Sequence, residues 1–156
     1  MKVLGILLCV QLVACQSNLK ESIASGSSSS VASENSSSQM AIDSCTPDTV
    51  LGNAFANQTS NLQVLVKGSV VRLLADDTAG DRHQRFIISL QSGQTLLVAH
   101  NIDLAARVEN LQTGTVVRIF GVYEWNGEGG VLHWTHRDPE KVHVDGWIEV
   151  GSVRYQ

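Results

Sequence analysis

The stretch "HNIDLAARVENLQTGTVVRIFGVYEW", from His100 to Trp125, decides the fold. It begins with an irregular polar segment and passes through a Leu-x-x-Gly motif at residues 111–114. A Val-x-x-Ile-x-Gly pattern from Val116 to Gly121 follows, in a run rich in apolar and β-branched residues. Such runs are typical of strands. The stretch therefore predicts an irregular connection that leads into a strand.

Strand-like runs lie on both sides of this stretch. They cover residues 62–75, 85–90, 95–100, 130–136, 143–150 and 152–155. They are short, rich in valine, leucine and isoleucine, and separated by turn signals, which is typical of all-β barrels and sandwiches. In the long first run, Gly68 stands where a strand can bend or bulge. The pattern predicts five or six strands.

Two dipeptides, Ser92-Gly93 and Asn126-Gly127, are hairpin-turn signals. We expect the runs on either side of each turn to form antiparallel pairs. The predicted pairs are 86–90 with 95–99, and 116–125 with 131–135.

The Leu-x-x-Gly motif with its following strand resembles the segment of OB-folds that leads into the fourth strand. Together with the strand spacing, this resemblance indicates a closed or partly closed barrel. A short helix is predicted over residues 45–58, because Thr46 suits the N-cap and Pro47 the first helical position. The predicted fold class is all-β, a small OB-like β-barrel preceded by one short N-terminal helix.

The first residues, "MKVLGILLCVQLVACQS", have the arrangement of an export signal. The apolar run is too short to span a bilayer, which needs about 20 apolar residues. Residues 12–15 resemble the lipobox of bacterial lipoproteins, in which the cysteine, here Cys15, is acylated and becomes the first residue of the mature chain. In that family an aspartate after the cysteine retains proteins at the inner membrane. Gln16 therefore favours the outer membrane, periplasmic side; a signal peptide cut near Ala14 is the alternative.

Three segments follow from this assignment. Residues 1–14 are the predicted signal peptide, residues 15–41 a lipidated, serine-rich flexible tether, and residues 42–156 the barrel domain with its helix. Cys45 is then the one thiol left after processing, so a disulfide scaffold is excluded. From Asn61 onward nine basic residues face eleven acidic ones. This balance makes non-specific nucleic-acid binding unlikely, because that binding relies on a basic surface.

Polar residues gather in four runs at the ends of predicted strands, where barrels display functional side chains. The candidate catalytic residues are His83, His100, His133, His136 and Asp138. The candidate ligand-binding residues are Arg82, Asn101, Asp103, Arg107, Glu124 and Trp134. Imidazoles oriented by carboxylates suit acid–base chemistry near neutral pH, and an arginine can hold an anionic group such as phosphate.

A divalent metal remains open as a cofactor, because imidazoles with carboxylates also suit zinc, copper or iron. Residues three apart on a strand point to opposite faces, so His133 and His136 cannot both serve one site from a regular strand. We therefore expect the strand to end or distort at about Thr135, so that at least three of the four candidate histidines share one pocket. The competing interpretation is that these residues only hold loops together.

Three motifs carry a further resemblance. They are H-Q-x-F at residues 83–86, A-H-N-I-D-L-A at residues 99–105 and H-W-T-H-x-D-P at residues 133–139. With them, the chain resembles an uncharacterised family of bacterial domains of unknown function. The resemblance implies no activity.

The functional interpretation is a lipid-anchored envelope protein whose polar His/Asp site binds a ligand. One alternative is a hydrolase of phosphoesters or nucleic acid, with or without a metal. A second alternative is an envelope protein-interaction module. The expected partners are the membrane, through the lipid, and a small ligand or phosphoester.

Overall fold

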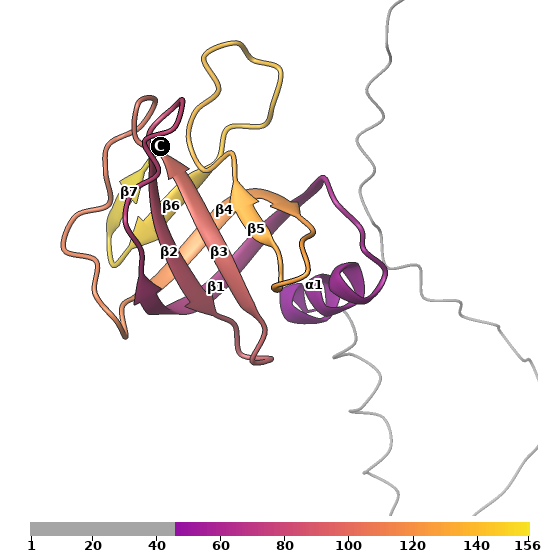
Figure 1. Ribbon diagram of the computed structural model, residues 1–156. Coiled ribbons are helices and arrows are strands. Elements are labelled where there is room, and N and C mark those ends of the chain that lie inside the picture. Colours follow the sequence, from indigo (N-terminus) through magenta and orange to yellow (C-terminus); the bar gives the residue numbers. More distant parts are fainter. Residues whose placement is uncertain (1–45) are drawn as a thin grey trace, which may run out of the picture. The chain divides into compact units, whose positions relative to one another are not determined.

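The computed structural model describes residues 46–156 (Figure 1). The predicted signal peptide, the predicted lipidation site Cys15, the predicted serine-rich tether and Cys45 lie outside the described residues. Within residues 46–156, no helix is both long and apolar enough to cross a membrane.

One helix and seven strands form the domain. They are α1 (Pro47–Ala56), β1 (Leu62–Leu73), β2 (His83–Ser89), β3 (Thr95–Asn101), β4 (Val116–Glu124), β5 (Val131–His133), β6 (Trp147–Val150) and β7 (Val153–Tyr155). The expected helix is confirmed: Thr46 caps it by accepting a hydrogen bond from the Thr49 backbone N–H at 3.3 Å. The count of seven strands exceeds the expected five or six.

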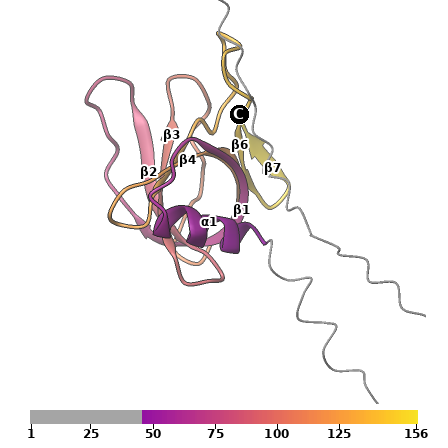
Figure 2. The ribbon, with the colours of Figure 1, turned by 90° about the vertical axis from the view of Figure 1, so that its right-hand side faces the viewer.

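The first five strands close into a barrel in the order β1-β2-β3-β5-β4, with β4 returning to β1. Closure is possible because β1 changes partner along its length. Its first part, up to Ser69, pairs with β4, and its last part, from Ser69, pairs with β2. β3 and β5 are parallel, and the other pairs are antiparallel. The OB-like barrel preceded by one short helix is therefore confirmed (Figures 1 and 2).

Gly68 lies next to Ser69, where β1 changes partner. The irregularity of β1 lies between Val70 and Arg72. At Gly68, a Cβ would lie 2.9 Å from the Ser89 carbonyl oxygen and 3.1 Å from the Ile88 Cδ1. The missing side chain lets β2 cross closely where β1 changes partner.

Both expected hairpins are present. β2 and β3 pair from His83 with Asn101 to Ser89 with Thr95, around a turn in which Gly93 has a φ of +88°. β4 and β5 pair through Val122 with His133 and Glu124 with Val131. Apolar side chains at alternate positions of these strands fill the barrel. Leu51 and Ala54 of α1 join this core, so the helix covers part of the barrel (Figure 2).

A loop of residues 134–146 interrupts what would otherwise be one long fifth strand. β5 and β6 both pair with β4, and this loop connects them (Figure 1, gold loop at the top). Gly121 of β4 lies beneath its start, where a Cβ would be 2.5 Å from the His133 carbonyl oxygen. Gly146 ends the loop, and its N–H donates to the His136 carbonyl at 2.9 Å. The two ends of the loop, Trp134 and Gly146, therefore lie close together at the barrel wall. We call this point the loop neck.

Candidate ligand-binding site

A groove of about 380 Å³ lies on the outside of the barrel, over β2, β3, β5 and the end of β4. We call it the outer groove. Its lining residues are Asp77, His83, Arg85, Leu97, Ala99, Glu124, Val131 and His133. Three apolar residues form a patch from β3 and β5, and five polar or charged residues surround it. A concave surface in which an apolar patch meets a few polar groups is typical of small-molecule sites.

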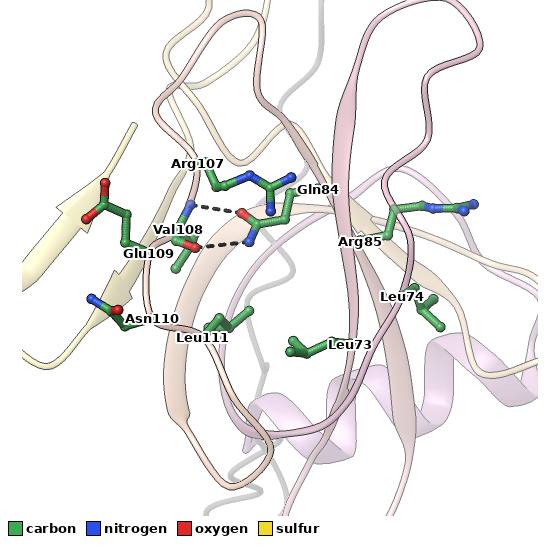
Figure 3. A pocket seen from close by; sticks show the side chains of 9 residues that line it. All are labelled: Leu73, Leu74, Gln84, Arg85, Arg107, Val108, Glu109, Asn110 and Leu111. Atoms are coloured by element: carbon green, nitrogen blue, oxygen red, sulfur yellow. Dashed lines mark hydrogen bonds between the residues drawn. The ribbon is translucent and has the colours of Figure 1, made fainter.

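Strand alternation determines which side chains reach this groove. On β2, His83 and Arg85 face outward, whereas Gln84 is buried with 6% of its surface exposed. Figure 3 shows Gln84 and Arg85 on opposite sides of β2. Ala99 pairs with Arg85, so both contribute to the same outer face.

Within the part of the chain that the structure describes, His83 has one ring nitrogen in a hydrogen bond and the other without one. Its Nδ1–H donates to the Asp81 carbonyl oxygen at 2.8 Å. Because a carbonyl can only accept, the proton of the neutral ring is on Nδ1 and the lone pair is on Nε2. This hydrogen bond also fixes the ring orientation.

His133 and Glu124 stand side by side on β5 and β4. His133 Nε2 lies 3.7 Å from Glu124 Oε1, too far for a hydrogen bond. The Nε2 atom is itself buried and has no hydrogen-bond partner among residues 46–156. Burial lowers the pKa of His133, and the nearby Glu124 carboxylate opposes that shift. The imidazole is therefore neutral at neutral pH.

Asp77 and Arg85, both in the lining of the groove, form an ion pair. The Arg85 Nη1 lies 3.8 Å from Asp77 Oδ2, and its Nε–H donates to the Ala75 carbonyl at 3.0 Å. Asp77 also accepts from the Ala79 N–H at 3.1 Å. These contacts fix the loop between β1 and β2 against the barrel.

His100 faces the interior and has no free nitrogen. Its Nδ1 accepts from the Thr135 hydroxyl at 2.8 Å, and its Nε2–H donates to the Ala106 carbonyl at 3.1 Å. The residue is fully buried, and this burial lowers its pKa to about 4. His100 thus joins β3 to two loops as a neutral core residue.

Asp138 organises the 134–146 loop. Its carboxylate accepts from the backbone N–H groups of Glu140, Val142 and His143 at 2.7–2.9 Å. These hydrogen bonds, that of His143 foremost, hold the pKa of Asp138 below its usual range. Only 3% of the residue is exposed. The carboxylate is occupied by the loop backbone, so it is not available as a catalytic base in this arrangement.

Trp134 marks the end of β5, close to the expected break at Thr135. Its φ of +52° turns the chain out of the strand. Its ring stacks on His143, with 3.7 Å between ring centroids. His136, just beyond, is buried and donates from Nδ1 to the Arg137 carbonyl at 2.7 Å. The strand therefore ends where expected, but His136 does not line the outer groove with His133.

The remaining candidates are engaged in loop contacts. The Arg82 guanidinium and backbone N–H both bind the Asp103 carboxylate at 2.7 Å, and these hydrogen bonds lower the pKa of Asp103. Asn101 accepts from the Asp103 N–H at 2.9 Å. Arg107 pairs with Asp76. These contacts tie the segment after β3 to the loop before β2.

The structure therefore brings three of the candidates, His83, Glu124 and His133, into the outer groove. This groove holds two of the four candidate histidines, fewer than the expected three, and His100 and His136 are buried outside its lining. Residues 46–156 contain no cluster of three histidine, cysteine or carboxylate side chains arranged to bind a metal.

A second cavity, of about 450 Å³, lies between the end of β1 and the segment after β3 (Figure 3). Gln84 of β2 lines this cavity. Its side chain donates to the Val108 carbonyl at 3.0 Å and accepts from the Val108 N–H at 2.8 Å. Arg107, also in its lining, is paired with Asp76. Gln84 and Arg107 are thus already paired, while Glu109 and Asn110 are exposed lining residues. The outer groove is the better candidate site, because it brings together three of the predicted site residues.

Residues 34–156 match the family described as "Protein of unknown function (DUF3465)". The chain belongs to this family. The expected resemblance to an uncharacterised family is thus confirmed at the level of the family. The chain matches no curated protein and no solved structure.

Sequence reasoning missed five groove residues of this family member. They are Asp77, Arg85, Leu97, Ala99 and Val131. Arg85 and Ala99 could have been found, because the predicted hairpin and strand alternation place them on the face of His83. Val131 could also have been found, because it lies two residues from His133 and opposite Glu124 in the second predicted hairpin. The local signals do not predict that the two hairpins meet in one groove, through the parallel pairing of Leu97 with Val131.

Proposed function

We propose that this protein is a ligand-binding module of the bacterial cell envelope and that its ligand occupies the outer groove. The observation that carries this proposal is the groove itself, in which an apolar patch meets unoccupied polar atoms. His83 keeps a lone pair on Nε2, and Glu124 accepts no hydrogen bond within the described residues. OB-folds bind ligands on the face formed by strands 2 and 3, which supports the same location.

The direct test is a substitution whose side chain fills the groove. Ala99 lies in the apolar patch and faces outward, so Ala99→Trp is expected to occupy the site while leaving the buried core intact. Small-molecule fragments that raise the melting temperature of the wild-type protein should lose that effect in the variant. Leu65→Trp is the matched control, because Leu65 is an exposed β1 residue outside the groove. Fragments that stabilise the Ala99→Trp variant as well as the wild type would refute the proposal.

The proposal also includes the location of the domain. Residues 12–15, with the cysteine at position 15, support lipid attachment to the outer membrane on the periplasmic side. Replacing Cys15 by serine is expected to remove the acyl chains and release the protein into the soluble periplasmic fraction. Fractionation with fatty-acid labelling measures this. A variant that stays in the membrane fraction and still takes up label would contradict the lipobox interpretation.

A hydrolase is the second candidate, and one observation favours it. His83 has its tautomer fixed by the Asp81 carbonyl and presents Nε2 as a potential general base. The groove charge argues against phosphoester substrates, because two carboxylates face one arginine in the lining. Ligand binding therefore remains the main proposal.

A further inference from the structure

Glu124 is the groove carboxylate that has no lysine or arginine partner among the described residues. Asp77 is paired with Arg85 and accepts a backbone hydrogen bond. Within residues 46–156, the one basic nitrogen within 4.0 Å of the Glu124 carboxylate is His133 Nε2, at 3.7 Å. The side chain of Glu124 is 38% exposed, so a ligand can reach it.

The charge of the groove is therefore set by Glu124. Asp77 and Arg85 offset each other. His133 does not compensate Glu124 at neutral pH, because burial lowers its pKa and keeps the ring neutral. One uncompensated negative charge is left beside the apolar patch.

The apolar patch begins directly beside this carboxylate. Val131 is the β5 residue that pairs with Glu124 on β4, and Leu97 of β3 pairs with Val131 from the other side. Ala99 lies two residues further along the outward face of β3. An apolar chain attached to a group at Glu124 can thus lie across these three residues.

We propose that the outer groove binds small organic cations in which a primary ammonium or guanidinium group carries a short apolar chain. The cationic group donates to the Glu124 carboxylate, and the chain covers Leu97, Ala99 and Val131. This inference rests on the proposed ligand-binding function and adds the chemical class of the ligand.

Anions of the same size fit less well. Glu124 repels them, and Arg85 is held by the Ala75 carbonyl and by Asp77. Recruiting Arg85 to an anion would require breaking those contacts. The groove thus discriminates by charge as well as by shape.

Three probes of equal chain length test the inference: n-hexylammonium, n-hexanol and hexanoate. Each is titrated into the protein at pH 7.5, and binding is followed by the amide NMR shifts of groove residues such as Ala99 and Val131. We expect n-hexylammonium to shift these amides with a Kd at least about tenfold lower than that of hexanoate. Glu124→Gln should raise the Kd of n-hexylammonium about tenfold or more and leave the Kd of n-hexanol unchanged.

Glu128→Gln is the matched control, because it removes the same charge from an exposed residue of the neighbouring turn. It should leave all three affinities unchanged. A hexanoate affinity equal to that of n-hexylammonium would overturn the cation proposal, as would an unchanged affinity in Glu124→Gln or the absence of groove shifts with any probe. The ligand-binding proposal is judged separately, by whether Ala99→Trp abolishes fragment binding.

Discussion

Replacing Gly146 by alanine is expected to destabilise the protein by about 3 kcal/mol, which is the upper range for overpacking a well-packed site. The new Cβ would overlap the Trp134 carbonyl oxygen and lie 2.7 Å from the Phe120 carbonyl oxygen. Both obstacles are backbone atoms, so no side-chain rotation relieves them. The neck of the 134–146 loop would have to open, and with it the Gly146 hydrogen bond to His136.

Chemical denaturation of both proteins measures this difference in the free energy of unfolding. Gly127→Ala is the matched control, because a Cβ there meets no atom within 4 Å. The control should stay within about 0.5 kcal/mol of the wild type. A Gly146→Ala variant as stable as the control would show that the loop neck is not as close as described.

His100 should make the protein sensitive to mild acid. Its pKa in the folded state is about 4, below the value of 6.5 for an unperturbed histidine. Between these values the unfolded chain binds the proton and the folded protein does not. The contribution of neutral His100 to the free energy of unfolding is therefore fully present above pH 6.5, and it is lost as the pH decreases toward 4. The expected loss is about 3 kcal/mol, since one pKa unit corresponds to about 1.4 kcal/mol.

The measurement is the free energy of unfolding at several pH values from 7.5 to 4, for the wild type and for His100→Gln. The variant has no ionisable group at this position, so its pH dependence should be flatter over this window, whatever its absolute stability. His133 contributes in the same direction, because burial also lowers its pKa. Measuring the pH dependence of His133→Gln as well separates the contribution of His133 from that of His100. Equal slopes for wild type and His100→Gln would contradict the buried, neutral assignment of His100.

Much of the fold could be predicted because its signals are local. The Ser92-Gly93 and Asn126-Gly127 turns fix two hairpins, and Thr46 with Pro47 fixes the start of the helix. The register shift of β1 lies between Val70 and Arg72, just beyond Gly68, and Gly68 itself is required by the approach of Ser89 on another strand. That approach is a tertiary contact, and a single strand pattern does not contain it.

The candidate site was predicted only in part for the same reason. His83, Glu124 and His133 reach one groove, but His100 is satisfied by Thr135 and Ala106. An exposed histidine and a buried, fully bonded one look alike in sequence. The sequence is equally ambiguous at Asp138, whose position before a proline suits either a turn or a functional site. In the structure its carboxylate accepts hydrogen bonds from later backbone N–H groups, which is a role in the turn.

The central claim, that the outer groove is the ligand site, is tested most directly by locating a bound ligand. Nuclear Overhauser contacts between a stabilising fragment and methyl-labelled protein give that location. We predict contacts with the methyl groups of Leu97, Ala99 and Val131, which lie in the outer groove. Contacts instead with Leu73, Leu74 and Leu111 of the second cavity would contradict the account.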